Sequence, residues 1–402
     1  MSVVVQKFGG TSVGSTEKIK NVARRVAESK KRIDHLVVVV SAPGKTTDEL
    51  VDLSKQISSN PPEREMDMLL STGEQVSMAL LAMALQELGV DAISMTGQQV
   101  NILTDTAHSK AKIRHVSTKR LTEELRRGKV VVVAGFQGVT GDGEITTLGR
   151  GGSDTTAVAL AASLHADCCE IYTDVDGVFT ADPRLVPNAR KLDEVSYLEM
   201  LEMATSGARV LQPRAVEYAR NYNVPLHVRS SFHEGEGTLV KSEDDIMEKA
   251  IISAVTHDFS EAKVTVSDVP DEPGIAAKLF TALADANINV DMIIQNVGEN
   301  RKATISFTIE EDDIEKVRSA IEDVADSMGA KSLDFDKGIA KVTLVGVGMR
   351  SNPGIAAQMF RTLSERGINI EMISTSPIKI SCIVREKDGE EALKSLHESF
   401  AL

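Results

Sequence analysis

The first 230 residues alternate between continuous apolar runs and stretches with helical periodicity. The runs Leu36–Ser41, Val130–Phe136 and Cys168–Val175 are apolar at most positions, as is typical of strands buried on both faces of a parallel sheet. Apolar residues at positions 19, 22, 23, 26 and 27 follow the period of a helix after Ser15, a suitable N-cap, and a similar stripe follows Asp154. This alternation predicts a three-layer α/β sandwich, with helices on both faces of a mainly parallel sheet.

The last part of the chain contains an internal repeat. Asp271–Ile293 and Ser351–Ile373 are offset by 80 residues and share 11 of 23 positions. Each copy follows a strand-like AKVT segment and contains a Pro-Gly turn, an amphipathic helix pattern and an alternating strand pattern, INVDM (288–292) or INIEM (368–372). A further strand and helix pattern follows each copy. The order predicts two ferredoxin-like βαββαβ modules.

A boundary between the two parts is predicted within residues 231–250. The stretch SFHEGEG has two glycines and no apolar periodicity after Phe232, and the acidic run SEDD follows it. We therefore expect a catalytic domain over residues 1–245 and modules over 262–337 and 340–402. Residues 246–261 are expected to form a linker or to add a strand to the second part.

Composition and charge restrict the classes of partner. The 402 residues are 42% hydrophobic and carry a net charge of −14, which argues against nucleic-acid and anionic-membrane partners. The three cysteines form no CxxC pair, and the histidines show no metal-ligand or triad spacing. No signal peptide is visible, and the longest apolar stretch is far shorter than a membrane span. These features predict a cytoplasmic protein.

The turn KFGGTS, from Lys7 to Ser12, has the composition of a phosphate-binding site. Its glycines permit close backbone approach, the following helix start attracts anions, and Lys7 adds a full positive charge. It matches no GxGxxG fingerprint. The nearby APGKTT resembles the end of a Walker A loop, but Val39 stands where that motif requires glycine, so we reject this interpretation.

Three further strand-end or helix-start segments carry polar groups. Arg150 lies among three glycines before Ser153 and Asp154, and residues 172–184 hold three aspartates. Glu74 begins an apolar helix pattern. Structural alternatives exist for each, namely an aspartate N-cap, ordinary turn dipeptides and a first-turn charge. Ligands in α/β sheets bind at the carboxyl ends of strands, so the combination favours a nucleotide-using small-molecule kinase with a duplicated regulatory tail.

Together, these segments resemble the amino-acid kinase family, in its aspartate-phosphorylating branch. The segments KFGGTS, SAPGKTTDEL, LLSTGEQVS, GFQGVTGDGEITTLGRGGSDTTA and YTDVDGVFTADPR follow the family's order, and the PGIAA repeats resemble tandem ACT domains. The resemblance implies the family's three-layer sandwich followed by two ACT modules. It also implies transfer of the ATP γ-phosphoryl group to the β-carboxylate of L-aspartate, with Mg²⁺ whose ligands stay unassigned.

The resemblance also implies roles for particular residues. Lys7 would contact the transferring phosphoryl group, Asp154 would organise Lys7, and Asp182 would lie near the metal and phosphates. The ATP-binding residues would be Lys7, Phe8, Gly9, Gly10, Thr11, Ser12, Ser41, Thr173, Asp174, Phe179, Arg184 and Arg209. The aspartate-binding residues would be Thr47, Glu74, Arg150, Gly151, Gly152 and Ser153, with Glu74 on the ammonium and Arg150 on the α-carboxylate. Arg209, Pro43 and Gln212 depart from the family's commoner residues.

The ACT modules imply feedback inhibition by lysine, threonine or both. The implied effector-binding residues are Asp271, Gly274, Ile275, Ala276, Asp291, Gln295, Gly354, Ile355, Asn369 and Ile370. A homo-oligomer through the ACT domains is expected, and an internal start at Met247 would give a separate small regulatory subunit. Two alternatives stay open: a kinase acting on glutamate or N-acetylglutamate, and an amino-acid-sensing protein with an inactive kinase domain.

Overall fold

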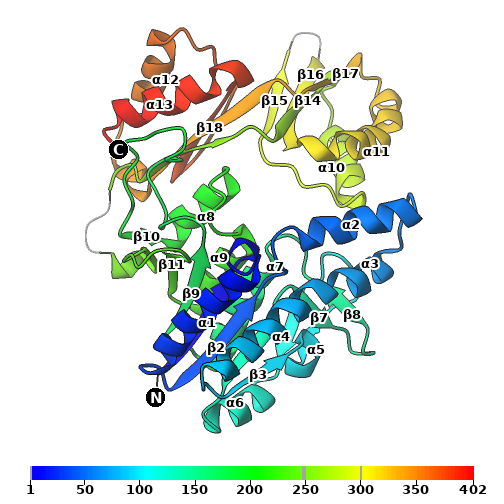
Figure 1. Cartoon of the computed structure of the whole chain (residues 1–402). Helices are drawn as coiled ribbons and strands as arrows, with labels where there is room; N and C mark the ends of the chain where they lie inside the picture. Colours follow the sequence, from blue (N-terminus) through cyan, green and yellow to red (C-terminus); the bar gives the residue numbers. More distant parts are fainter. Residues whose placement is uncertain (1, 247–249, 299–300) are drawn as a thin grey trace. The chain divides into compact units, whose positions relative to one another are not determined.

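The computed structural model describes residues 2–246, 250–298 and 301–402. The chain forms two compact units, which are described separately (Figure 1). The first unit contains Met1–Phe179, Lys191–Thr205 and Arg209–Glu248, and the second contains Thr180–Arg190, Ser206–Ala208 and Lys249–Leu402. Met247, the candidate internal start, lies outside the described residues.

An eight-stranded sheet forms the centre of the first unit. Its order is β10-β12-β11-β9-β1-β2-β6-β3, and every neighbouring pair is parallel except β11 and β12. The strands are β1 (Val3–Phe8), β2 (His35–Val40), β3 (Ala92–Met95), β6 (Val130–Ala134), β9 (Cys168–Thr173), β10 (Glu194–Ser196), β11 (Leu226–Ser230) and β12 (Thr238–Lys241). The three predicted buried strands are confirmed as β2, β6 and β9.

Helices cover both faces of this sheet. On one face, α1 (Thr16–Lys30) and α4 (Thr72–Glu87) pack on alternate residues of β1, β2 and β6, including Phe8 and Val38. On the other face lie α7 (Gly152–Leu164) and α9 (Pro213–Tyr222). The Ser15 side chain accepts a hydrogen bond from the Lys18 N–H, as predicted for an N-cap.

Shorter elements complete the first unit. They are α2 (Thr46–Ile57), α3 (Glu63–Leu70), α5 (Gly97–Val100), α6 (Lys119–Arg126), α8 (Tyr197–Thr205) and a small sheet of β5 (Ile113–Val116), β4 (Ile102–Thr104), β7 (Gln137–Val139) and β8 (Ile145–Thr147). The segment SFHEGEG connects the antiparallel strands β11 and β12.

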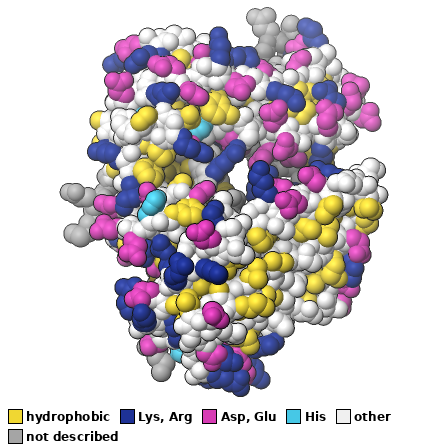
Figure 2. Space-filling view, in the orientation of Figure 1, with side chains coloured by type: hydrophobic (Ala, Val, Ile, Leu, Met, Phe, Trp, Pro, Cys, Tyr) yellow, Lys and Arg dark blue, Asp and Glu magenta, His cyan; other side chains and the backbone are white. Residues whose placement is uncertain are grey.

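Helix α4 is apolar on its exposed side as well as on its buried side. Val76, Leu80 and Met83 are exposed on it, near exposed apolar residues of α2 and α3, and Figure 2 shows hydrophobic side chains gathered on this part of the first unit. By length and composition alone, the segment Glu63–Glu87 is long and apolar enough to cross a membrane. The segment nevertheless comprises two helices, and Asp67 and Glu74 are buried within the unit, as in a core helix.

The second unit contains two four-stranded antiparallel sheets, each covered by two helices. The sheet of order β15-β16-β14-β17 is built from one continuous βαββαβ segment: β14 (Glu261–Pro270), α10 (Ile275–Asp285), β15 (Ile293–Val297), β16 (Lys302–Glu310), α11 (Ile314–Ser327) and β17 (Ser332–Asp336). Its core includes Leu279, Phe307 and Ile321.

The other sheet receives its last strand from outside the repeat. Its order is β13-β18-β20-β19, formed by β18 (Ile339–Val345), α12 (Ile355–Glu365), β19 (Met372–Ser376), β20 (Lys379–Arg385), α13 (Gly389–Ser399) and the earlier strand β13 (Ala254–Asp258). The first module is thus inserted between β13 and β18. Of the two options for residues 246–261, the added strand is present.

The predicted strands INVDM and INIEM begin later than the alternation suggested. Regular pairing starts at Ile293 in the first module and Met372 in the second. Ile288 and Met292 are buried, which produced the alternating pattern, but residues 288–292 connect the helix to the edge strand. Alternation reports which side chains are buried and not whether the backbone is paired.

Candidate active site

The turn after β1 lies against the ends of two neighbouring strands. The Gly9 N–H donates to the Tyr172 carbonyl at the end of β9 (3.3 Å), and the Gly44 N–H donates to the Gly10 carbonyl (3.0 Å). A Cβ at Gly10 would come within 2.8 Å of the Ala42 carbonyl oxygen, so this position requires glycine. The KFGGTS and APGKTT turns therefore form one continuous backbone surface at the carboxyl edge of the sheet.

Lys7 and Asp154 form a largely buried ion pair beside this turn. Lys7 Nζ is 2.6 Å from Asp154 Oδ1, and the two side chains are only 12% and 9% exposed. A Cβ at Gly9 would be 3.6 Å from Lys7 Nζ, so the ammonium group lies next to the glycine turn. Asp154 is in the first turn of α7, whose N-cap is Gly151, and so Asp154 is not the N-cap.

Glu74 provides a buried carboxylate at the start of α4. Its Oε1 accepts the Ala42 N–H at 3.0 Å, while Oε2 is buried and has no hydrogen-bond partner among the described residues. Burial raises the pKa of Glu74 to about 7, against the smaller opposing effect of its backbone hydrogen bonds. Gly73 permits the close contact, since a Cβ there would lie 2.8 Å from Ala42 Cβ. A cationic group would satisfy the free oxygen.

The Arg150 turn is shaped by left-handed glycines. Gly149 and Gly151 have φ of 77° and 70°, and a Cβ at Gly151 would come 2.0 Å from Gln212 Cγ. Gln212, one of the departures from the family pattern, thus packs directly on this turn. Arg214 donates to the carbonyl oxygens of Leu148, which directly precedes this turn, and of Ala111, both at 2.8 Å. Arg150 itself is exposed.

The remaining predicted first-unit residues fall into two groups. The Phe8 side chain is fully buried and stacks on Tyr172 at 4.6 Å, and the Ser12 hydroxyl is buried as well, so only their backbones border the turn. The groups at or near the surface are those of Gly9, Gly10, Thr11, Ser41, Thr47, Thr173, Asp174, Phe179 and Arg209, while Gly152 and Ser153 are buried at the start of α7.

Asp182 and Arg184 belong to the second unit. Arg184 Nε and Nη2 donate to Asp182 Oδ1 and Oδ2 at 3.0 and 2.7 Å, and this pairing lowers the pKa of Asp182 against the effect of partial burial. No group of three or more His, Cys, Asp or Glu side chains among the described residues is arranged to hold a metal ion. Mg²⁺ commonly uses one or two carboxylates together with phosphate oxygens and water, so a protein cage is not required.

The predicted effector-site residues repeat their geometry in the two modules. Gly274 and Gly354 are N-caps of α10 and α12 with φ of 100° and 99°, and neither helix has a side-chain cap. The adjoining residues Ile275, Ala276 and Ile355 begin the helices, Asp271 precedes one turn, Asn369 and Ile370 precede β19, and Gln295 is exposed on β15. Uncapped first-turn N–H groups can bind a carboxylate.

Asp291 makes an ion pair with the other module. Lys341, on β18, is 1% exposed, and its Nζ is 2.6 Å from Asp291 Oδ2 and also bonded to Glu261. Burial raises the pKa of Glu261, whereas burial of Lys341 is outweighed by the two carboxylates, which raise the pKa of Lys341. The equivalent acid of the second module, Glu371, pairs with Lys263 of the first. The lysine of each module therefore forms an ion pair with the equivalent acid of the other module.

Sequence reasoning missed several residues that support the site. Tyr172 packs under the glycine turn, Gln212 restricts the Arg150 turn, and Ser231 bonds to Ser12. Ser231 follows β11, which is parallel to β9, so the rule that polar residues at strand ends line a site would have identified it. The sequence singled out Gln212 only as a departure from the family pattern, and no local pattern indicated its contact with the Arg150 turn.

Comparison with known proteins gives consistent matches. The profile of the amino acid kinase family matches residues 2–230, and ACT-domain profiles match residues 251–326 and 342–400. The chain is 54% identical over 407 residues to an aspartokinase of Mycolicibacterium smegmatis, covering 100% of this chain and 97% of that protein.

Solved structures agree with this relationship. One is E. coli aspartokinase III in complex with aspartate and ADP, in the R-state, with a TM-score of 0.86, 26% identity and complete coverage of both chains. Another is the same enzyme with lysine and aspartate, in the T-state, with a TM-score of 0.77, 26% identity and 99% of each chain covered.

Proposed function

The chain belongs to the amino acid kinase family and, within it, to the aspartokinases, and we propose that it transfers the ATP γ-phosphoryl group to the β-carboxylate of L-aspartate. The product would be 4-phospho-L-aspartate, the first intermediate toward lysine, threonine and methionine. The observation that most supports this substrate is Glu74, a buried carboxylate with one oxygen unpaired among the described residues. A substrate ammonium group fits that oxygen.

The chemistry needs charge neutralisation more than proton transfer. The β-carboxylate of aspartate has a pKa near 4, so it is ionised at neutral pH and needs no general base. The barrier comes from repulsion between this carboxylate and the phosphates. Lys7 lies beside the glycine turn, where it would offset that repulsion, and its ion pair with Asp154 would hold the ammonium group in place.

Aspartate recognition would use both signs of charge. Glu74 would bind the α-ammonium group, and the exposed Arg150 guanidinium would bind the α-carboxylate through two parallel hydrogen bonds. Thr47, Ser153 and the backbone of Gly151 and Gly152 would complete the pocket. Fixing both α-substituents leaves the β-carboxylate as the group that can reach the phosphate.

The nucleotide would lie at the carboxyl end of β9. Thr173, Asp174, Phe179 and Arg209 of the first unit are the proposed contacts, and the nucleotide roles of Asp182 and Arg184 stay predictions from the resemblance. The Asp174 carboxylate is exposed and makes no ion pair among the described residues, so it fits the role of a Mg²⁺ ligand. When bound, Mg²⁺ would neutralise charge on the phosphates.

The ACT modules would make the activity sensitive to amino acids. The E. coli relative is described in a lysine-bound T-state, and lysine, threonine or both are the proposed effectors here. The uncapped helix starts after Gly274 and Gly354 supply N–H groups for an effector carboxylate. Inhibition follows if the effector binds a less active arrangement more tightly.

A homo-oligomer through the ACT sheets is part of the proposal. β15 and β19 are edge strands, and they expose Ile293, Val297 and Ile373. Exposed apolar edge strands are surfaces that pair with another chain. A separate small regulatory subunit starting at Met247, and a cytoplasmic location, stay predictions.

An ADP-release assay with separate acceptors tests the proposed activity. The full chain with ATP and Mg²⁺ is given L-aspartate, L-glutamate, N-acetyl-L-glutamate or no acceptor. We expect turnover with L-aspartate alone, inhibited by lysine, threonine or their mixture. Turnover with glutamate or its N-acetyl form would support a different kinase, and absence of turnover with intact amino-acid binding would support a sensor.

A further inference from the structure

The hydroxyl of Ser12, in the turn after β1, contacts the hydroxyl of Ser231. Ser12 is 1% exposed, and its Oγ is 2.6 Å from Ser231 Oγ, while its N–H donates to the Gly9 carbonyl at 2.9 Å. The N–H and the hydroxyl of Ser12 therefore each have a partner within the protein. We expect Ser12 to contribute to phosphate binding mainly through the shape of the turn.

Ser231 joins the ends of three neighbouring strands. It follows β11, and its N–H donates to the Thr173 carbonyl of β9 at 2.8 Å. Its hydroxyl reaches Ser12 in the turn after β1. One residue thus connects the glycine turn to the strand end that carries the proposed nucleotide residue Thr173.

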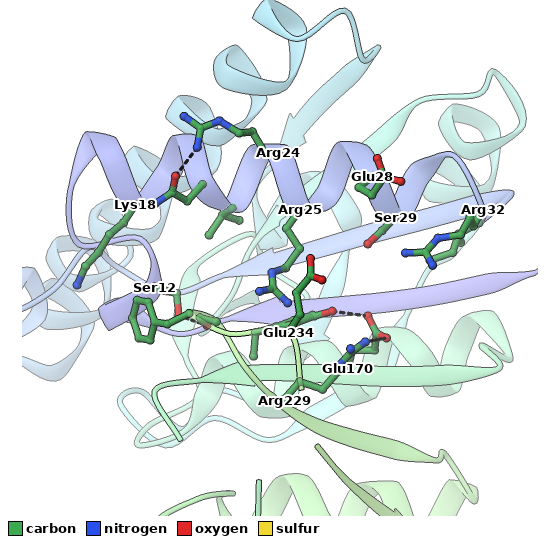
Figure 3. A pocket seen from close by; sticks show the side chains of 16 residues that line it. Ser12, Lys18, Arg24, Arg25, Glu28, Ser29, Arg32, Glu170, Arg229 and Glu234 are labelled. Carbon is green, nitrogen blue, oxygen red and sulfur yellow. Dashed lines mark hydrogen bonds and ion pairs between the residues drawn. The ribbon is translucent and has the colours of Figure 1, made fainter. Parts of the chain in front are cut away.

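A second contact connects Phe232, the residue after Ser231, to the Gly9–Ser12 turn. Lys18 Nζ donates to the Thr11 carbonyl at 3.0 Å and lies 5.3 Å from the centre of the Phe232 ring. Further along the loop of residues 231–237, Arg25 donates to the His233 carbonyl and Arg229 donates to the Gly235 carbonyl, both at 3.1 Å. Figure 3 shows Lys18, Arg25 and Arg229 among the side chains that line a cavity of about 770 Å³, with α1 on one side and β9 and β11 on the other. The loop of residues 231–237 is therefore held at several points, and through Ser231 it can hold Ser12 in place.

We propose that Ser231 is a positioning residue for phosphoryl transfer, which holds the Gly9–Ser12 turn in the geometry that receives the ATP phosphates. The proposal rests on the proposed nucleotide role of this turn. Loss of the hydroxyl leaves Ser12 Oγ buried without its Ser231 partner, so the turn is held to the strand ends by fewer bonds, among them the one from the Gly9 N–H to the Tyr172 carbonyl. A hydrogen bond contributes about 0.5–1.5 kcal/mol, which corresponds to roughly a 2- to 12-fold change in ATP affinity.

The test compares substitutions of equal shape in the full chain. Ser231→Thr keeps the hydroxyl, and Ser231→Val has nearly the shape of threonine but no hydroxyl. Ser231→Ala removes the hydroxyl and adds no volume. Ser163→Ala is the control, because Ser163 donates to a carbonyl within α7 and touches none of these loops. Kinetic constants are measured for both substrates, together with calorimetric binding of a non-hydrolysable ATP analogue.

We expect the Ser231→Val and Ser231→Ala variants to have a higher KM for ATP and analogue binding weaker by roughly 2- to 12-fold, with the KM for aspartate unchanged. Thr and the control should behave as the parent does. In a Ser12→Ala background, Ser231→Ala should have no further effect, because its partner is gone. An equal effect in both backgrounds, an unchanged ATP constant, or a matching rise in the aspartate KM would overturn the proposal. If aspartate is not phosphorylated at all, the proposed function fails, yet analogue binding still tests Ser231.

Discussion

Lys7 Nζ lies 2.6 Å from Asp154 Oδ1, and this ion pair joins the end of β1 to the first turn of α7. Both side chains are largely buried, so each charge depends on the other for compensation. We therefore expect the pair to have two separable roles, one in stability and one in charge neutralisation at the Gly9–Ser12 turn.

Replacing Lys7 separates these two roles. Lys7→Met should lower turnover by at least about 100-fold, because one preorganised charge is lost. It should also destabilise the fold by about 3–5 kcal/mol, since Asp154 is left unpaired. The double variant Lys7→Met/Asp154→Asn should recover much of the stability in thermal unfolding but none of the turnover. Recovery of turnover in the double variant would contradict the catalytic role of Lys7.

Glu74 should make aspartate binding depend on pH. Burial raises the pKa of Glu74 to about 7, and only its ionised form pairs with an ammonium group. The KM for aspartate should therefore fall as pH rises through about 7, and Glu74→Gln should raise that KM and remove this dependence. The measurement is the pH profile of the KM for aspartate. A parent profile that is flat across this range would show that Glu74 does not bind the ammonium group.

Stability gives an independent check on Glu74. Its folded-state pKa of about 7 exceeds the ordinary value of 4.5, so the folded state binds the proton more tightly. Ionisation of Glu74 then destabilises the fold as pH rises between these two values. Glu74→Gln removes that penalty, and the variant should gain up to roughly 3 kcal/mol relative to the parent between pH 4 and pH 8. Denaturant unfolding at several pH values measures it.

Arg150 should act on aspartate and not on ATP. Arg150→Ala should raise the KM for aspartate at least about 10-fold, since a charge-assisted pair contributes about 1.5–3 kcal/mol. Arg150→Lys should restore little, because lysine lacks the planar fork. Arg126→Ala, an exposed arginine on α6, is the matched control. If only the KM for ATP rose, the carboxylate role would be wrong.

Alanine substitutions at two glycines can distinguish the effect of backbone strain from the effect of a steric clash. Gly143 and Gly151 both have positive φ, but a Cβ at Gly143 would meet nothing within 4 Å, whereas one at Gly151 would clash with Gln212. Gly143→Ala should cost about 1–2 kcal/mol and leave the KM for aspartate unchanged. Gly151→Ala should also displace the Arg150 turn and raise that KM. Equal kinetics in the two variants would show that Gln212 yields without moving the turn.

The ion pair between the ACT modules should control stability and inhibition together. Lys341→Met leaves Glu261 buried beside Asp291 without a cation, so unfolding should become easier by about 3–5 kcal/mol. Adding Glu261→Gln should restore part of that stability. An effector ammonium group that binds Asp291 must compete with Lys341, so the double variant should be inhibited at lower effector concentration. Unchanged inhibition would place the ammonium group elsewhere.

The sequence by itself determined most of the elements and predicted the chemistry of the turns. Continuous valine-rich runs are typical of strands buried on both faces of a sheet, and the 11 identities between the repeats predicted two similar modules. Lysine, glycine and hydroxyl groups at strand ends indicated phosphate chemistry, because local backbone geometry and charge are written in neighbouring residues. Strand starts were less certain, as INVDM shows, since burial and pairing give the same alternation.

Only the tertiary structure decided which distant residues meet. It paired Lys7 with Asp154, packed Gln212 against Gly151, and took β13 from outside the repeat to complete the second ACT sheet. It also left one oxygen of the buried Glu74 without a hydrogen-bond partner among the described residues. It also joined Ser231 to Ser12 across 219 residues of chain. A pKa, a steric limit and an ion pair all depend on separations of a few ångströms between residues that are remote in sequence, and local patterns carry no information about such separations.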